Sequence, residues 1–320
     1  MRGVFLDTAT LGEDIDLTAL KKSLEDWTFF SLTAPEEVQA RLQDADVVVT
    51  NKVVLDAQLI ASLPKLRCIC LTATGTNNVD LAAAQRAGIP VLNVTNYAGA
   101  SVAQHVVAMT LALATQWHLY AKDVRKGVWS AAPAFCLMHR PVMELAGKTF
   151  GIIGYGALGQ AVANAVTALG MNVLIAQSHS GAQDVNRVTL PELLSRSDVV
   201  SLHCPLTETT EKMVNADFLS AMKSSAFLIN SARGGLVDET ALRNALLAGD
   251  IGGAALDVLT VEPPPMDHPL LSIQLDNLII TPHNAWISLA ARQRLMDQVA
   301  DNIEAWKVGQ CKNCVNGVEA

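Results

Sequence analysis

Three glycines at fixed spacing, placed between an apolar run and a helical pattern, constrain the fold of this chain most. The apolar run covers residues 149–153, the glycines are Gly154, Gly156 and Gly159, and a helical pattern covers residues 158–168. The first glycine permits a tight turn, the second lets a ligand approach the backbone, and the third lets the helix pack closely on the strand. The order predicts a strand–turn–helix unit of a parallel sheet.

Short apolar runs alternate with helical patterns on both sides of this loop. In the first hundred residues the strand-like runs are at residues 4–6, 46–49, 66–71 and 91–94. A second series begins near Lys148, and its six candidate strands are at residues 149–153, 172–176, 199–203, 226–230, 254–258 and 278–281. This alternation predicts two parallel sheets, each covered by helices on both faces.

Two long helical patterns flank the second series. One runs from about Ser101, which we expect to be its N-cap, to about Lys126, and the other from about Leu289 to Val308. The sheets and helices together predict the α/β fold class, with room in 320 residues for two domains.

Composition excludes several classes of partner. Half of the residues are hydrophobic and 17% are charged, as in compact globular proteins. The formal net charge of −8 argues against binding to nucleic acid or to an anionic membrane. No secretory pattern opens the sequence, and residues 102–114, the longest apolar helical segment, are too few to span a bilayer. We therefore expect a cytoplasmic protein.

The six cysteines do not predict a metal site. Cys311 and Cys314 have C-x-x-C spacing, but no second ligand pair accompanies them, and structural zinc needs four ligands. We interpret all six as reduced thiols.

The glycine loop predicts a dinucleotide site. A helix N-terminus offers unpaired N–H groups and a partial positive charge to a pyrophosphate. An acid at the end of the next strand would hold the ribose hydroxyls of NAD, and Gln177 stands there instead. No arginine is immediately adjacent to attract the 2′-phosphate of NADP, Arg187 being the nearest. The choice between NAD and NADP stays open.

Three polar residues follow predicted strands of the second series. Arg233 follows residues 226–230, Glu262 follows residues 254–258, and His283 follows residues 278–281. Parallel strands end on one edge, where ligands bind, so we expect the three side chains to converge there. The planar fork of Arg233 suits a carboxylate, and the alternative is a structural ion pair across its loop.

An imidazole at His283 can supply the proton that a ketone oxygen needs when hydride arrives at carbon. A carboxylate at Glu262 would orient the ring and favour its protonated form, although Glu262 could equally be a turn residue before Pro263. The remaining histidines are interpreted as mainly structural: His105, His118, His139, His179, His203 and His268.

Two further charged residues stand at strand ends. Asp257 ends an otherwise small and apolar strand, where an acid is costly unless it is paired. Lys52 ends a strand of the first series and could add positive charge, although its default interpretation is a surface lysine.

With these residues in hand, the chain resembles the D-isomer-specific 2-hydroxyacid dehydrogenases over nearly its whole length. The motifs stand in family order: the glycine loop at 154–159, Asn-Ser-Ala-Arg-Gly-Gly at 230–235, Gly-Ala-Ala-Leu-Asp-Val at 253–258, Glu262 followed by proline, and Thr-Pro-His at 281–283. Residues 50–56 and 71–78 look like the glycerate dehydrogenase, or hydroxypyruvate reductase, branch. Gln177 and Gln104 depart from the family pattern, which usually has an acid at each place.

The resemblance implies roles for these residues. Arg233 would bind the substrate carboxylate, His283 would donate the proton and Glu262 would be its partner. The substrate set that we expect is Lys52, Ala73, Thr74, Gly75, Arg233 and His283. The cofactor set that we expect is Thr74, Val102, Gly154, Gly156, Ala157, Leu158, Gly159, Gln177, Cys204, Pro205, Ala232, Asp257 and His283.

The resemblance also implies an architecture. A flavodoxin-like substrate domain would comprise residues 1–99 and 289–320, and an inserted Rossmann dinucleotide-binding domain would comprise residues 100–288. Family members are usually homodimers through the dinucleotide-binding domain.

The leading hypothesis is NAD(P)-dependent reduction of hydroxypyruvate or glyoxylate to D-glycerate or glycolate. The alternative is a dinucleotide-sensing regulator of the same fold, like the transcriptional corepressors of this superfamily. The complete set of Arg233, Glu262 and His283 argues against the regulator. The acid at Glu262 argues against formate dehydrogenase, which pairs its histidine with an amide.

Overall fold

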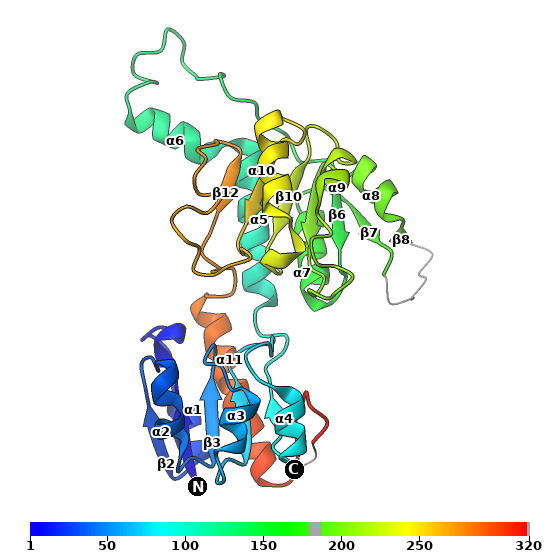
Figure 1. Ribbon diagram of the computed structural model, residues 1–320. Helices are drawn as coiled ribbons and strands as arrows, with labels where there is room; N and C mark the ends of the chain where they lie inside the picture. The colour runs from blue at the N-terminus through cyan, green and yellow to red at the C-terminus, as the bar shows by residue number, and fades with distance from the viewer. Residues whose placement is uncertain (179–186, 319–320) are drawn as a thin grey trace. The chain divides into compact units, whose positions relative to one another are not determined.

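The computed structural model describes residues 1–178 and 187–318, and it divides by its internal contacts into two compact units. Unit 1 comprises Met1–Ala98 and Ile287–Ala320, and unit 2 comprises Gly99–Trp286. Each unit is built on its own parallel sheet with helices packed against it (Figure 1). The predicted α/β class with two parallel sheets is confirmed.

The sheet of unit 1 has the strand order β2-β1-β3-β4-β5, which is the flavodoxin-like order 2-1-3-4-5. Its strands are β1 (Arg2–Phe5), β2 (Asp26–Phe29), β3 (Val47–Thr50), β4 (Cys68–Leu71) and β5 (Val91–Leu92). Its helices are α1 (Thr18–Ser23), α2 (Val38–Leu42), α3 (Ala57–Ala61), α4 (Leu81–Arg86) and α11 (Leu289–Lys307), with short 3₁₀ turns η1 (Thr8–Leu11) and η2 (Pro35–Glu37).

Strand β2 was not predicted from the sequence. It lies at the edge of the sheet and pairs only with β1 among the described strands, so none of its residues is fully buried. A half-exposed edge strand needs no continuous apolar run, and Asp26 and Thr28 interrupt the pattern by which the other strands were predicted.

The sheet of unit 2 has the order β12-β11-β10-β9-β6-β7-β8, which is the Rossmann order with a seventh strand at one edge. Its strands are β6 (Thr149–Ile153), β7 (Asn172–Ala176), β8 (Arg187–Val188), β9 (Val199–Leu202), β10 (Phe227–Asn230), β11 (Gly253–Leu256) and β12 (Leu278–Ile280). Its helices are α5 (Gly99–Thr115), α6 (Trp117–Arg125), α7 (Ala157–Thr167), α8 (Leu190–Arg196), α9 (Ala216–Ser220) and α10 (Glu239–Ala248), with a 3₁₀ turn η3 (Gly234–Leu236).

The central strands of unit 2 are buried along their whole length. Every residue of β9, β10 and β11 is buried, because helices cover both faces of the parallel sheet. This is why their sequences read as short continuous apolar runs. The two-residue strand β8, which was not predicted, is half-buried. It lies at the edge of the sheet opposite to β12.

The single long helix expected over residues 101–126 is wrong, because the chain breaks at Gln116. That residue adopts a left-handed conformation with φ of 49° and separates α5 from α6. The Thr115 hydroxyl donates to the Leu111 carbonyl, and the Met143 N–H donates to the Ala114 carbonyl. A continuous helix would need the Ala114 carbonyl for the N–H of the residue four positions later. Ser101 is not an N-cap either, since α5 begins at Gly99.

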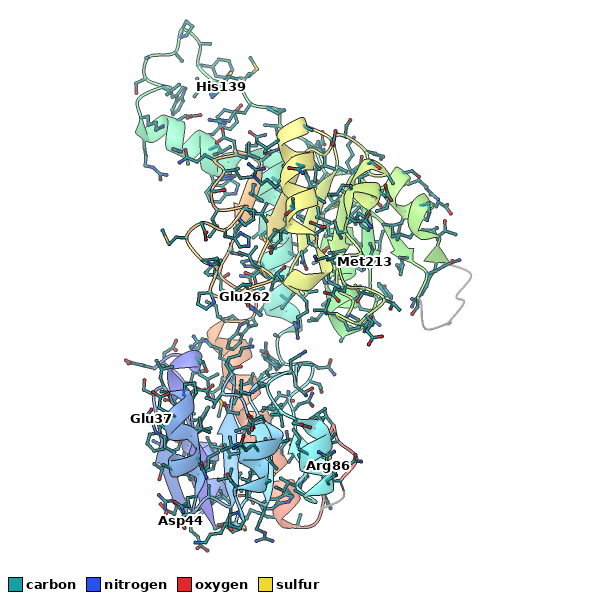
Figure 2. All side chains as sticks on the ribbon, in the orientation of Figure 1. Glu37, Asp44, Arg86, His139, Met213 and Glu262 are labelled. Carbon is teal, nitrogen blue, oxygen red and sulfur yellow. The ribbon has the colours of Figure 1, made fainter. Side chains whose placement is uncertain are left out.

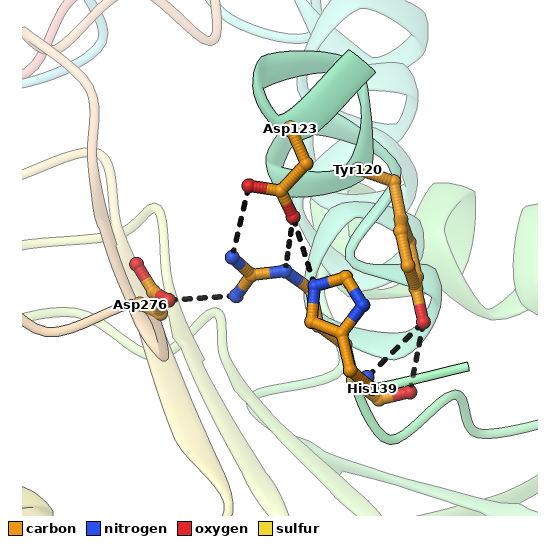
Figure 3. Close-up of polar contacts among 5 residues, drawn as sticks. Tyr120, Asp123, His139 and Asp276 are labelled. Atoms are coloured by element: carbon orange, nitrogen blue, oxygen red, sulfur yellow. Dashed lines mark hydrogen bonds and ion pairs between the residues drawn. The ribbon is translucent and has the colours of Figure 1, made fainter. Parts of the chain in front are cut away.

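Helix α6 and the coil after it, residues 126–142, extend from the rest of unit 2, and we call this segment the arm (Figure 1). Arg140 anchors the C-terminal end of the arm. The Arg140 Nε lies 3.0 Å from Asp123 Oδ2 on α6, and the Arg140 Nη1 lies 2.7 Å from Asp276 Oδ2 (Figure 3). Hydrogen bonds from Arg140 and His139 hold the pKa of Asp123 below its usual range. No helix in the described parts of the chain is long and apolar enough to cross a membrane.

Candidate active site

The three polar residues predicted to converge follow neighbouring strands of unit 2. Strands β10, β11 and β12 lie side by side and parallel, so their carboxyl ends share one edge. Arg233 lies in the loop after β10, Glu262 in the coil after β11 (Figure 2), and His283 directly after β12. Each predicted strand therefore delivers its residue to the same edge.

The loop of Arg233 is held by a buried asparagine that the sequence analysis did not assign. Asn230 ends β10 and is fully buried; its Oδ1 accepts from the Ala232 N–H at 3.0 Å, and its Nδ2 donates to the Arg233 carbonyl at 2.9 Å. The Arg233 side chain is exposed, and its Nη1 lies 2.7 Å from the Ala232 carbonyl. An amide at the end of a buried strand is the signal that could have identified this role.

Gly234 brings the arginine loop against the segment that leads to Glu262. A Cβ at Gly234 would lie 2.0 Å from the Leu259 carbonyl carbon and 2.3 Å from the Thr260 nitrogen, so only glycine fits. The loops after β10 and β11 are thus packed backbone to backbone.

Glu262 and His283 form the predicted acid–imidazole pair. Glu262 Oε2 lies 2.6 Å from His283 Nδ1, and Glu262 Oε1 accepts from the Leu259 N–H at 2.9 Å. The side chains are about one third exposed, 36% for Glu262 and 33% for His283. Among the described residues nothing hydrogen-bonds to the other ring nitrogen of His283, Nε2. That nitrogen is available to a substrate.

The backbone of His283 is in the left-handed region, with φ of 53°. Histidine is one of the few residues with a side chain that is found there with some frequency. Its N–H donates to the Asp257 carbonyl at 2.7 Å, which fixes the turn to the end of β11.

Asp257 secures the same turn from inside. Its side chain is 1% exposed; Oδ1 accepts from the Thr281 hydroxyl at 2.6 Å and the Asn284 N–H at 2.9 Å, and Oδ2 accepts from the Ala285 N–H at 2.9 Å. His105 Nε2 lies 3.4 Å from Oδ1 and 3.0 Å from the Thr281 hydroxyl. Burial pushes the pKa of Asp257 up, but these hydrogen bonds outweigh it, and the pKa lies below its usual range.

The glycine loop lies where the strand order of unit 2 reverses, between β6 and β9. Gly154 has φ of +94°, and a Cβ there would lie 2.4 Å from the Cys204 nitrogen in the loop after β9. A Cβ at Gly159 would lie 2.3 Å from the Gly154 carbonyl oxygen. The turn and the close helix packing predicted for these two glycines both follow from these contacts.

The residues present fit a dinucleotide. Helix α7 begins at Ala157, its N-cap Gly156 makes no side-chain cap, and a Cβ at Gly156 would point into open space. The first N–H groups of α7 therefore face an open position beside the glycine loop, as a pyrophosphate requires.

The other expected cofactor residues of unit 2 lie on several elements. Val102 is buried on α5, Ala232 is half-buried beside Arg233, and Pro205 is exposed after β9. Cys204 is half-buried with Sγ 3.9 Å from Met213 Sδ, and burial raises the pKa of its thiol. Burial also lowers the pKa of the neighbouring His203 to about 4.

Gln177 is exposed after β7, and its N–H donates to the Val188 carbonyl on β8. Arg187, on β8, has its guanidinium 6.0 Å from the ring of Tyr155 in the glycine loop. A cation thus lies beside the loop even though none adjoins Gln177 in sequence.

Unit 1 carries the remaining expected residues at its own strand ends. Asp7, 2% exposed after β1, accepts from the N–H groups of Asn51 at 2.9 Å and Lys52 at 2.7 Å, and so holds the loop after β3. This role of Asp7 was not predicted, although an acid directly after a buried strand was the available signal. Lys52 itself has an exposed side chain.

Ala73, Thr74 and Gly75 follow β4. In the described part of the chain, the N–H groups of these three residues have no hydrogen-bond acceptor. They are half-buried or exposed, so a ligand can reach them.

The histidines interpreted as structural take different places. His268 is 4% exposed and pairs with Glu239 at 3.0 Å, and His139 belongs to the arm anchor. His179 lies outside the described residues. Among the residues that the structure describes, no group of three or more His, Cys, Asp and Glu side chains is placed to hold a metal ion.

A Rossmann-type sheet with an acid-backed imidazole and an arginine at its carboxyl edge defines the class of dinucleotide-dependent oxidoreductases. The model of the D-isomer specific 2-hydroxyacid dehydrogenase family, NAD binding domain, matches residues 107–285. The chain belongs to this family.

Similar proteins agree in name and extent. The chain is 46% identical to a glycerate dehydrogenase of Methylorubrum extorquens, covering 98% of each chain, and 40% identical to a hydroxypyruvate reductase of Blautia hydrogenotrophica, covering 89% of each. Among solved structures, an NADPH-dependent glyoxylate/hydroxypyruvate reductase of Sinorhizobium meliloti, in complex with NADP and malonate, superimposes with a TM-score of 0.83 at 28% identity, covering 99% of this chain and 98% of that one. These comparisons confirm the predicted family and its glycerate dehydrogenase branch.

Proposed function

We propose that this protein reduces a short 2-oxo acid, hydroxypyruvate or glyoxylate, to D-glycerate or glycolate with NADH or NADPH. The observation that carries the proposal is the 2.6 Å contact of Glu262 with His283 at the sheet edge that also presents Arg233. The names of the relatives support the same substrate class.

Each residue at the edge has one role in this proposal. Arg233 binds the substrate carboxylate through its planar fork and so orients the adjacent carbonyl. His283 donates a proton from Nε2 to the carbonyl oxygen, and Glu262 holds Nδ1, which fixes the ring and stabilises its charged form. When bound, the reduced nicotinamide supplies the hydride.

Unit 2, in this proposal, is the cofactor domain. The N–H groups at Ala157, Leu158 and Gly159 hold the pyrophosphate beside Gly154 and Gly156. The further contacts proposed are Val102, Gln177, Cys204, Pro205, Ala232, Asp257 and His283, with Thr74 from unit 1. The family model for an NAD binding domain supports this assignment. Both NADH and NADPH remain candidates.

Unit 1, in this proposal, is the substrate domain. Lys52 supplies positive charge, and the N–H groups of Ala73, Thr74 and Gly75 bind an anionic substrate. The observation in support is that these N–H groups lack acceptors among the described residues. Backbone N–H groups of one loop are a common way to hold an anion.

We further propose that the protein is a homodimer that assembles through unit 2. In support, large apolar side chains are exposed on the arm, among them Trp117, Trp129, Phe135 at 89% and Met138 at 83%. Large apolar side chains exposed together on one segment are typical of interfaces between proteins. Sedimentation of the wild type and of Phe135→Asp tests the interface: the variant should sediment as a monomer, and an unchanged dimer would argue against the arm.

We also propose the cytoplasm as the location of the protein. Nucleic acid and anionic membranes are not proposed as partners, because the net charge of the chain is −8. Cell fractionation tests the location.

The deciding experiment is oxidation of NADH and of NADPH by the purified protein with a panel of 2-oxo acids, including hydroxypyruvate, glyoxylate and pyruvate. Arg233→Ala should raise KM for hydroxypyruvate about 100-fold, because two charge-assisted hydrogen bonds are lost. Arg233→Lys, which keeps the charge but loses the fork, should recover only part of this loss.

The alternative function, a dinucleotide-sensing regulator, makes the opposite prediction. The protein would bind NADH or NADPH but consume neither with any member of the panel. The relatives reported above are named as enzymes and give this alternative no support.

A further inference from the structure

The loop of Ala73, Thr74 and Gly75 is tied by three hydrogen bonds to the segment that follows β5. The Val94 N–H donates to the Ala73 carbonyl at 3.1 Å, and the Thr74 hydroxyl donates to the Val94 carbonyl at 2.7 Å. The third bond comes from a side chain of the segment after β5: Asn93 Nδ2 donates to the Thr74 carbonyl at 2.8 Å.

Both polar groups of the Asn93 backbone, the N–H and the carbonyl, are hydrogen-bonded. Asn93 is 6% exposed, its N–H donates to the Asn313 carbonyl at 3.1 Å, and its carbonyl accepts from Asn302 Nδ2 at 2.8 Å. Asn302, 2% exposed on α11, accepts in turn from Asn313 Nδ2 at 2.9 Å. Buried amides in a satisfied network hold one geometry, because water cannot replace a lost partner.

This network sets the direction of one peptide group. In a planar trans peptide the C=O and the following N–H point in opposite directions. Since Asn93 holds the Thr74 carbonyl, the Gly75 N–H points away from Asn93. That N–H has no acceptor in the described part of the chain, and it is one of the groups proposed above to bind the substrate.

We propose that Asn93 is a positioning residue for the substrate, an inference that rests on the proposed function. It acts through the Thr74–Gly75 peptide, whose N–H it turns toward the anionic group of the 2-oxo acid. The C-terminal segment around Asn313 and helix α11 complete the support from behind.

The test compares Asn93→Ala and Asn93→Asp with a matched control, Asn316→Ala. Asn316, 8% exposed, also binds the edge of the sheet beside β5, with Oδ1 accepting from the Val91 N–H at 3.1 Å and Nδ2 donating to the Ile89 carbonyl at 2.9 Å. It makes no bond to the loop after β4. Removal of either amide should lower Tm to a similar extent.

The readouts are kcat and KM for hydroxypyruvate, together with Tm. Asn93→Ala should raise KM about 10-fold with kcat within about threefold, the loss expected when one buried hydrogen bond stops orienting a binding group. Asn93→Asp should raise KM further, because its carboxylate would face the Thr74 carbonyl. Asn316→Ala should leave KM unchanged.

A milder variant covers the case in which the Asn93 variants do not fold. Asn313 is exposed with φ of 56°, a conformation that glycine adopts readily, so Asn313→Gly should fold. It removes the amide that supports Asn302, and KM should rise two- to threefold.

Equal rises of KM in the Asn93 and Asn316 variants, or no rise in the Asn93 variants, would overturn the inference while wild-type activity upholds the proposed function. If neither Asn93 variant folds, an unchanged KM in the Asn313→Gly variant would overturn the inference. Wild-type protein that reduces no 2-oxo acid would overturn the proposed function, and this inference with it.

Discussion

Two carboxylate–imidazole pairs lie at the same edge of the unit 2 sheet. They differ in burial and in how many of their hydrogen-bonding atoms already have partners within the protein. Asp257 is 1% exposed, and both its oxygens accept hydrogen bonds from the turn of residues 281–285, with His105 behind. Glu262 and His283 are about one third exposed, and His283 Nε2 is unengaged within the described residues.

The difference indicates a structural role for the Asp257 pair and a role in proton transfer for the Glu262 pair. A buried acid whose hydrogen bonds are all made within the protein fixes the backbone around it and has little left for a substrate. An exposed pair with one open ring nitrogen can exchange a proton with a bound molecule. The two pairs are coupled, because Asp257 holds the turn that presents His283.

The largest effect is expected at His283. His283→Asn should lower kcat for hydroxypyruvate reduction about 10³-fold, the range that a general acid contributes. Asparagine tolerates the left-handed backbone at this position, so Tm should stay close to that of the wild type. Steady-state kinetics with parallel calorimetry measure both, and a large fall in Tm would instead assign His283 a structural role.

The next largest effect is expected at Asp257, on stability. Asp257→Asn should cost about 3 kcal/mol at pH 7, because an amide cannot accept the buried N–H and O–H donors at both its polar atoms. The folded pKa of Asp257 lies below the unfolded value of about 3.9, so its contribution is present above that pH and is lost as the pH falls through the folded pKa. In denaturant titrations, the difference in unfolding free energy between the two proteins should therefore narrow as the pH falls below about 4; a constant difference down to pH 2 would contradict this role of Asp257.

A smaller effect is expected at Glu262. Glu262→Gln should lower kcat about 30-fold, since the amide can still hold the ring but gives the imidazolium no opposite charge. Glu262→Asp keeps the charge on a shorter side chain, so its kcat should lie between that of the wild type and that of Glu262→Gln. Activity equal to wild type in Glu262→Gln would show that the carboxylate charge has no part in the chemistry.

The smallest effect is expected at His105. His105→Ala should cost about 1 kcal/mol of stability, the net worth of one hydrogen bond, and should leave kcat within about twofold. A loss of activity comparable to that of His283→Asn, at unchanged Tm, would reverse the assignment of the two pairs.

Much of the fold could be predicted from the sequence because its signals are local. Buried parallel strands read as apolar runs, and the spacing of Gly154, Gly156 and Gly159 encodes its own turn and helix contact. The same runs placed Arg233, Glu262 and His283 at strand ends, and hence at one edge.

What escaped prediction depends on contacts between distant segments. The break at Gln116 involves Met143, which returns to bind the end of α5, and the edge strands β2 and β8 are too exposed or too short to leave an apolar run. The sequence predicted the pairing of Glu262 with His283 but left open that Glu262 is a turn residue, and it gave His105 no partner. Asp257 and Glu262 follow the same strand, and only the path of the chain between them directs one inward and the other to His283.

Glu262 and His283 are proposed to act as one chemical unit, and a double-mutant cycle tests this most directly. The kcat of the wild type, Glu262→Gln, His283→Asn and the double variant would be measured with hydroxypyruvate under identical conditions. If Glu262 acts only through His283, its substitution costs about 30-fold in the wild-type background and nothing once the imidazole is gone. The same loss in both backgrounds would contradict the account.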